Sequence, residues 1–238
     1  MAKVLDLTIP IPPLPVQNEI VRILDNFTEL TAELTAELTA RKKQYEYYRR
    51  ASLSFSQDMH VAKWMALHEV ANVFRGEYIT KKSTREGSIP VILGGQEPAY
   101  YIDKSNHNGE VVVISRSGAS AGFVSYWNEP IFVTDAFGYE AKPNVVSGKY
   151  LYYSLKNIES EINSMKRGAG VPHVSGEALG KIQLPIPPLA EQQRIVAILD
   201  RFDTLCNDIS AGLPAEIEAR TKQYEYYRDK LLTFPERA

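Results

Sequence analysis

Apolar residues recur at spacings of three and four along the first part of the chain. The positions are Ile20, Ile23, Leu24, Phe27, Leu30, Leu34 and Leu38. This period predicts an amphipathic helix with one apolar stripe. Prolines cannot lie inside a helix, so the proline-rich stretch at 10–15 indicates that it begins near Val16, and the pattern lets it run to about Ser52. A helix of roughly 55 Å needs a partner for its stripe, with two core helices of a compact domain as the alternative.

The far end of the chain supplies such a partner, because the same motifs occur there again. IPIPPL at 9–14 recurs as LPIPPL at 184–189, and QYEYYR at 44–49 recurs at 223–228. Residues between the two motifs match as well, at an offset of 175 that becomes 179 by the second motif. Such internal similarity predicts that both copies form the same kind of element. We therefore expect two long helices that pack against each other.

Each copy has one special feature. In the first, TELTAELTAELTA at 28–40 is a tetrapeptide array, and one unit added or removed changes the helix length by about 6 Å. The array predicts a spacer of variable length, with a merely helix-prone stretch as the alternative. In the second copy, residues 210–214 interrupt the helix, and we expect Gly212 to cap the first piece and Pro214 to open the next.

The block between the copies has a different pattern. Residues 63–74 and 151–165 have helical periodicity. Short β-rich runs lie between them at 89–93, 111–115, 122–127 and 131–134, separated by turn signals. The expected fold class is α+β: one globular domain of mixed, mostly antiparallel strands at 59–181, flanked by long helical regions at 1–58 and 182–238.

Composition excludes several classes of protein. Among 238 residues, 27 Lys and Arg stand against 29 Asp and Glu, so the net charge of −2 indicates no overall basic character. The sequence contains no apolar run of 18 residues, so no membrane span is predicted, and the N-terminus lacks the apolar stretch of a signal peptide. Cys206 is the single cysteine, which excludes an internal disulfide and is typical of a reducing cytoplasm. Phosphate-binding, metal-binding and catalytic motifs are absent from the sequence, so we expect no cofactor, no metal and no catalysis.

Loop-like segments of the central block nevertheless carry basic side chains beside small or aromatic residues. Such groups suit contact with phosphates and base edges, and a glutamine can pair with adenine through two hydrogen bonds. The candidate DNA-contacting residues are Arg75, Lys81, Lys82, Gln96, Arg116, Lys166, Arg167 and His173. For each segment by itself, an ordinary solvated loop is the alternative.

Several strings together resemble the specificity subunits of type I restriction-modification systems. They are GEYITKK at 76–82, IPVILGGQEPAYYID at 89–103, SRSGASAG at 115–122, and the stretch from VPHVSG at 171–176 to IPPLAEQQRI at 186–195. In that family, a subunit carries two target recognition domains, each of which reads half of a bipartite DNA site. Two long conserved helices, packed antiparallel as a coiled coil, separate these domains. The TAEL array resembles the spacer repeats of the IC subgroup.

The chain departs from the family pattern because it carries one recognition domain, like a half-subunit. The resemblance then implies a homodimer that reads two inverted half-sites of double-stranded DNA in the cytoplasm. It also implies type I DNA adenine methyltransferase subunits and restriction/translocase subunits as partners. We expect helix packing or dimer contacts at Leu30, Leu34, Leu38, Tyr45, Tyr48, Leu205, Ile209, Tyr224 and Tyr227. A DNA reader for a type II-like enzyme and a coiled-coil scaffold that binds only protein are the alternatives, and salt-dependent DNA binding separates the last of these from the others.

Overall fold

The chain folds into two compact units, each described by itself. A computed structural model describes residues 9–55, 61–80, 84–93, 95, 97–168 and 170–234. The helical unit comprises Met1–Glu46 and Asp200–Ala238, and the globular unit comprises Tyr47–Leu199. These divisions fall inside two helices, whereas the sequence predicts segments that end at 58 and 181.

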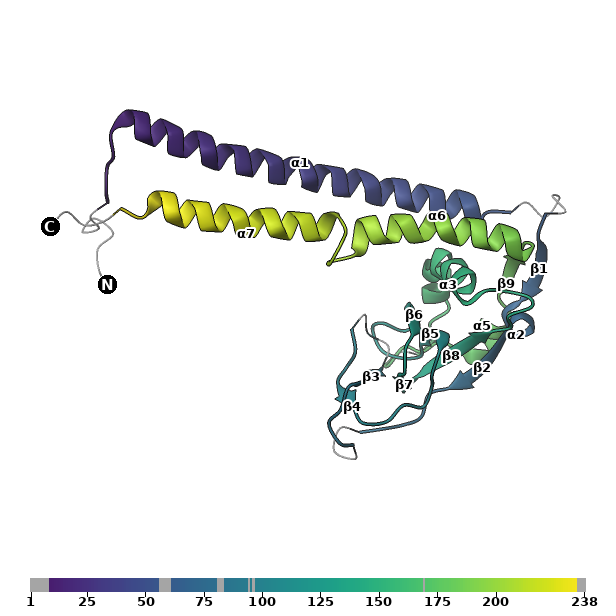
Figure 1. The fold of residues 1–238 in the computed structure, drawn as a ribbon. Coiled ribbons are helices and arrows are strands. Elements are labelled where there is room, and N and C mark those ends of the chain that lie inside the picture. Colours follow the sequence, from purple (N-terminus) through teal and green to yellow (C-terminus); the bar gives the residue numbers. More distant parts are fainter. Residues whose placement is uncertain are drawn as a thin grey trace. The chain divides into compact units, whose positions relative to one another are not determined.

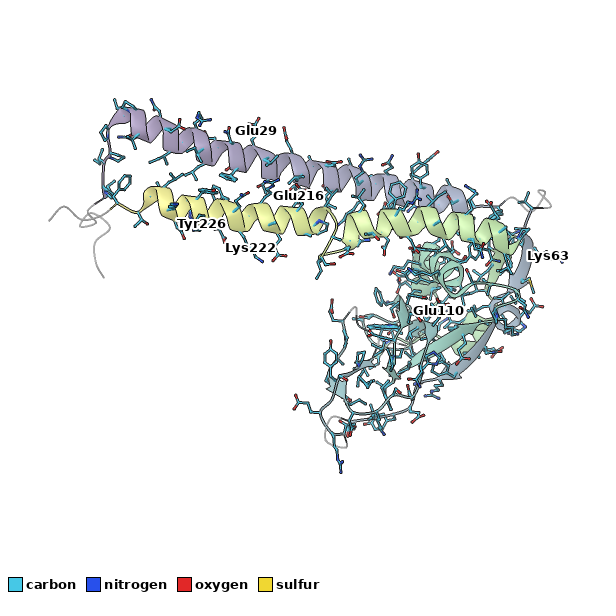
Figure 2. The ribbon with its side chains drawn as sticks, viewed as in Figure 1. Glu29, Lys63, Glu110, Glu216, Lys222 and Tyr226 are labelled. Carbon is cyan, nitrogen blue, oxygen red and sulfur yellow. The ribbon has the colours of Figure 1, made fainter. Side chains whose placement is uncertain are left out.

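The long helices have the expected positions. Helix α1 spans Leu14–Leu53, close to the predicted range of 16–52. The second copy forms α6 (Leu189–Asn207) and α7 (Leu213–Leu232), and Figure 1 shows α7 running beside α1 in the opposite direction. On the far side of α7, Lys222 and Tyr226 point away from α1 (Figure 2).

Two aromatic pairs hold the helices of this unit together. Phe27 stacks on Tyr227 with ring centroids 5.4 Å apart, and Tyr45 stacks on Phe202 at 6.2 Å. The residue numbers rise from 27 to 45 along the first helix while those of their partners fall from 227 to 202, so these pairs show that the helices are antiparallel. Phe27 and Phe202 are equivalent positions of the repeat, so each copy contributes one phenylalanine to a tyrosine of the other copy's QYEYYR motif. The packing is not symmetric in detail, because Tyr45 is the first tyrosine of its motif whereas Tyr227 is the last of its own.

The predicted interruption of the second helix is present, with one correction. Helix α6 ends at Asn207 and α7 begins at Leu213, with Pro214 in its first turn as predicted. Gly212 is the N-cap of α7 and does not cap α6, because Asp208 closes the connection instead. The carboxylate of Asp208 accepts hydrogen bonds from the Ser210 amide at 2.7 Å and the Ser210 hydroxyl at 2.6 Å, and these bonds lower its pKa.

The described residues of the globular unit contain three small sheets. The first pairs β1 (Lys63–Ala66) with β9 (Gln183–Ile186). The second has the order β2 (Ala71–Arg75), β8 (Ala136–Ala141), β5 (Glu110–Ser115) and β6 (Val124–Asn128). The third has the order β4 (Tyr101–Ile102), β3 (Ile89–Ile92) and β7 (Phe132–Val133). Every pair is antiparallel except β3 with β7, so the predicted α+β class with mostly antiparallel strands is confirmed.

The helix predicted for 63–74 is wrong. The segment forms β1, a single helical turn α2 (Leu67–Val70) and β2. Its helical spacing arises because Leu67, Val70 and Ala71 are all buried, whereas the backbone on either side pairs with distant strands. The Glu69 carboxylate accepts the Ala66 amide at 2.6 Å and so fixes the turn. Tertiary pairing here overrides the local pattern.

The core of the globular unit surrounds β5, which is why VVVIS reads as a continuous apolar run. Val111 and Val113 pack in one cluster with Ile92, Ile131 and Val133. Helix α3 (Gly148–Asn157) packs against β5 and β6, with buried side chains along its inner face. The single helix predicted for 151–165 is divided into α3 and α4 (Glu159–Ser164), and the short α5 (Gly176–Gly180) precedes β9.

Candidate nucleic-acid interface

Five of the eight candidate DNA-contacting residues lie within the described residues. Arg75 is the last residue of β2, and Arg116 directly follows β5. Lys166, Arg167 and His173 belong to the connection between α4 and α5. The other three candidates, Lys81, Lys82 and Gln96, lie outside the described residues.

Backbone hydrogen bonds join two of these segments side by side. The Val174 amide donates to the carbonyl oxygen of Arg116 at 2.9 Å, and the Gly118 amide donates to that of Pro172 at 3.0 Å. Arg167 and His173 exchange amide-to-carbonyl hydrogen bonds at 3.0 and 2.8 Å. The segment that carries three of the candidates is therefore a hairpin held against the loop after β5.

Lys166 extends this contact through its side chain. Its Nζ donates to the carbonyl oxygen of Ala119 at 3.0 Å, in the same loop. Lys166 is half-buried, whereas the side chains of Arg167 and His173 are exposed. The hairpin thus presents two free polar side chains to solvent and uses a third to fix its position.

Arg75 and Arg116 come together on the other side of the loop. Both line a pocket of about 360 Å³, together with Gly76, Tyr78, Ile79, Leu93, Thr134 and Asp135. The Gly76 amide donates to the Ala136 carbonyl at 2.9 Å, which lays the segment after β2 across the start of β8. A Cβ on Gly76 would lie 2.7 Å from the Val133 carbonyl oxygen, so only glycine permits this approach.

These contacts make one continuous surface, which we call the basic rim: Arg75, Arg116, Lys166, Arg167 and His173. Its members come from the ends of two strands and from one hairpin, which lie far apart in the sequence. The charge of the chain as a whole is −2, so this grouping of basic residues is a local feature. Loops that serve only as solvated connections have no need to lie side by side in this way.

Two further residues adjoin the basic rim and were not among the residues that the sequence predicted. Tyr78 is 90% exposed beside Arg75, and only the folded structure shows that its ring has no cover. Asp135 lies opposite Arg116, and its Oδ1 accepts from Nη1 of Arg116 at 3.1 Å. The string VTDAF carries no motif that would have singled out Asp135.

The packing candidates of the helices divide by position. Tyr45 is buried, and Leu34, Leu38 and Tyr224 are half-buried; Leu30, Tyr48, Leu205 and Tyr227 are partly exposed. Ile209 is 79% exposed in the connection between α6 and α7. Ile209 is therefore not packed between the helices of this unit, because the break at Asp208 removes it from the apolar stripe, and a dimer contact at this residue stays a prediction.

The two copies of the proline-rich motif differ sharply in burial. In the second copy, Leu184 and Ile186 are 1% and 7% exposed, because β9 pairs with β1. In the first copy, the equivalent Ile9 and Ile11 are 71% and 79% exposed. Among the described residues, the first copy has no paired strand.

The glutamine that follows each motif shows the same contrast. Gln192 is fully buried: its Nε2 donates to the carbonyl oxygens of Pro187 and Val145, both at 2.9 Å, and its Oε1 accepts from the Ser147 amide at 2.9 Å. Gln17 repeats only the first of these bonds, from its Nε2 to the Pro12 carbonyl at 2.7 Å. The glutamine of the second copy is thus hydrogen-bonded to the backbone of Val145 and Ser147 in the globular unit, and the first copy has the equivalent side chain, Gln17.

Neither a metal centre nor a membrane segment is found in the described ranges. No three His, Cys, Asp or Glu side chains gather there in a way that could hold a metal ion. No helix among these residues is long and apolar enough to span a bilayer.

Comparison with known proteins decides the family. The model of the type I restriction modification DNA specificity domain matches residues 1–41 and 62–219, which is most of the chain. The chain belongs to this family. A type I restriction enzyme specificity subunit of Escherichia coli is 38% identical over 257 aligned positions, covering 95% of this chain and 63% of that protein.

Other relatives are also type I specificity subunits, and they differ in how much of their own length this chain covers. A putative type I specificity subunit of Haemophilus influenzae is also 38% identical, covering 98% of this chain and 65% of that protein, so this specificity-domain chain spans about two thirds of both. A putative type I specificity subunit of Mycoplasma pneumoniae, 32% identical, is covered over 91% of its own length. The crystal structure of a type I restriction-modification S subunit from M. genitalium has the same fold, with a TM-score of 0.71 at 20% identity over 94% of this chain and 62% of that one.

Proposed function

We propose that this chain is a non-catalytic subunit that selects the DNA sequence on which a type I restriction-modification enzyme acts. The observation that carries the proposal is the basic rim, in which backbone hydrogen bonds and one shared pocket bring together the three separate segments that carry these five residues. Arginine and lysine bind phosphates, and arginine also binds guanine through two parallel hydrogen bonds. Relatives that are named specificity subunits support the same role.

We further propose that the chain works as a homodimer on two inverted half-sites. One globular unit offers one reading surface, and a two-fold axis would supply the second in inverted orientation. The exposed first copy of the proline-rich motif supports an arrangement with two reading units, because that copy retains the groups with which the second copy holds its own unit.

The remaining parts of the proposal follow from the family. Type I adenine methyltransferase and restriction/translocase subunits would dock on the assembly in the cytoplasm, and the helical unit would set the distance between the half-sites. The TAEL array supports this spacer role, because it lies between the two aromatic pairs that hold the helices together.

Base-resolution mapping of adenine methylation tests the proposal. The full chain is expressed with a type I methyltransferase subunit in cells that lack other adenine methylation. We expect methylation at a gapped palindrome that appears only when this chain is present. An asymmetric gapped motif would refute the homodimer while keeping the specificity role. A partner complex that forms but methylates no chain-dependent motif would refute the specificity role and favour a protein scaffold.

A further inference from the structure

Asp135 lies against Arg116 of the basic rim, a position that needs a physical explanation. A carboxylate beside basic side chains that contact DNA repels the phosphates and so opposes binding of any sequence. The backbone of Asp135 is also unusual, with a positive φ of 41°, a strained conformation that residues other than glycine rarely adopt. Both features are unfavourable unless the carboxylate has a role at this place.

Its contacts show what the carboxylate does. Oδ1 accepts from Nη1 of Arg116 at 3.1 Å, and Oδ2 accepts from the hydroxyl of Ser117. The backbone adds a third tie, because the Arg116 amide donates to the Asp135 carbonyl at 3.1 Å. Thr134 and Ala136 on either side are buried, so the whole segment is fixed in the core. Asp135 is therefore a rigid support for the arginine that follows β5.

The guanidinium of Arg116 is held but not covered. Its side chain and that of Asp135 are each 34% exposed, and both line the pocket that Arg75 and Tyr78 also line. A guanidinium has five N–H donors, and one hydrogen bond to Asp135 leaves the others available. Fixing the fork in advance lowers the entropy lost when it pairs with one base, and partial neutralisation weakens its attraction to phosphates in general.

We propose that Asp135 is a positioning residue for sequence discrimination: it orients Arg116 toward a base edge and suppresses binding to unrelated DNA. The proposal rests on the specificity function argued above and adds the residue that separates specific from non-specific binding. It assigns a favourable role to a negative charge on a DNA-contacting surface, because specificity depends on the difference between two affinities rather than on either one.

The substitution Asp135→Asn tests this role. Asparagine has the same shape, tolerates a positive φ and can still accept a hydrogen bond, but it lacks the charge. Binding is measured for the complex of the full chain with its methyltransferase subunit. The two probes are a duplex that carries the methylation motif mapped for the wild type and a duplex in which that motif is scrambled, each across a salt series.

We expect the ratio of the two affinities to fall at least tenfold. Binding of the scrambled duplex should become several-fold tighter and more salt-dependent, by about one phosphate contact, which is a slope change of roughly 0.9. Ser117→Ala loosens the carboxylate without changing the charge, so it should lower the affinity ratio with the salt slope unchanged. It also tests the role independently if Asp135→Asn fails to fold.

Glu129→Gln is the matched control. Glu129 follows β6 at the end where Asn128 pairs with Glu110, so it lies at the opposite end of β5 from Arg116, at least roughly 20 Å along the strand. The same change in net charge at this site should leave the affinity ratio unaltered.

Three outcomes have distinct meanings. An unchanged affinity ratio in Asp135→Asn and Ser117→Ala overturns the positioning role, as does a parallel loss of both affinities, which a purely structural residue would cause. An equal effect of Glu129→Gln overturns it as well, since net charge alone would then explain the result. Failure of the proposed function is separate, because the wild type itself would then have no motif to map.

Discussion

Replacing Gln192 by alanine is expected to destabilise the globular unit far more than the same change at Gln17 destabilises the helical unit. The two residues occupy equivalent positions of the repeat, so the change in side-chain volume and helix propensity is identical. What differs is the surroundings: Gln192 makes three hydrogen bonds in a fully buried site, and Gln17 makes one in a half-buried site.

The expected magnitudes follow from these bonds. A hydrogen bond contributes about 1 kcal/mol net, and a buried partner left unsatisfied costs about 1–3 kcal/mol. Removing Gln192 leaves the Ser147 amide and the carbonyls of Pro187 and Val145 without it, so we expect a loss of about 3 kcal/mol. For Gln17→Ala we expect about 1 kcal/mol or less.

Two intrinsic probes report on the two units separately. Both tryptophans of the chain, Trp64 and Trp127, lie in the globular unit, and the single cysteine, Cys206, lies in the helical unit. In urea, with a slope of about 2 kcal/mol per molar, Gln192→Ala should lower the midpoint of the tryptophan transition by about 1.5 M. Gln17→Ala should leave this midpoint unchanged and lower only the urea concentration at which the Cys206 thiol becomes exposed.

Equal stability losses in the two variants would refute the reasoning. They would mean that the first copy of the motif is as fully covered in solution as the second. A tryptophan midpoint that stays unchanged in Gln192→Ala would instead show that the hydrogen bonds of Gln192 do not stabilise the globular unit. The denaturant slope must be the same in wild type and variants for either conclusion, because a changed slope would indicate altered compactness.

Three further predictions concern other parts of the molecule. Burial raises the pKa of the Cys206 thiol, so alkylation of the native chain should be much slower than alkylation in urea, most clearly near the ordinary thiol pKa; equal rates would contradict its burial. Deleting one TAEL unit, residues 31–34, shortens α1 by about 6 Å between Phe27 and Tyr45. The deletion should shorten the gap of the methylation motif and leave its half-sites unchanged. An altered half-site with the same gap would rule out the spacer role. Arg116→Ala should relax discrimination at one base position and cost about 1–3 kcal/mol of specific binding, measured against a duplex series with single base changes; uniformly weaker binding would make Arg116 a phosphate contact.

The helices could be predicted because their signals are local. Apolar spacing, the prolines at 10–15 and the glycine-proline pair near 212 all act within a few residues of where they stand. Helix α1 accordingly begins and ends close to the predicted positions, and the break between α6 and α7 falls where it was expected. The repeat also predicted that the two helices would pack together, and the reciprocal Phe27–Tyr227 and Tyr45–Phe202 pairs bear this out.

The segment at 63–74 shows where local patterns fail. Three buried residues at helical spacing imitate a helix, but β1 pairs with residues 183–186 and β2 with residues 137–141, more than 60 positions away. No window of local sequence contains these partners. Hydrogen bonding across such distances competes with the helix, and the paired strands prevail.

The candidate interface divides in the same way. Residue types alone pointed to arginines, lysines and a histidine in loops, since these are the side chains that bind phosphates and base edges. Their convergence on one rim depends on backbone hydrogen bonds between the loop after β5 and the hairpin at 166–174, and on the close approach that Gly76 permits. Asp135 and Tyr78 joined the surface for the same reason, because exposure and contact are properties of the folded chain. The sequence by itself therefore determined the two long helical segments, the repeat and the family. Only tertiary structure decided which polar side chains share a surface, because that depends on contacts between residues far apart along the chain.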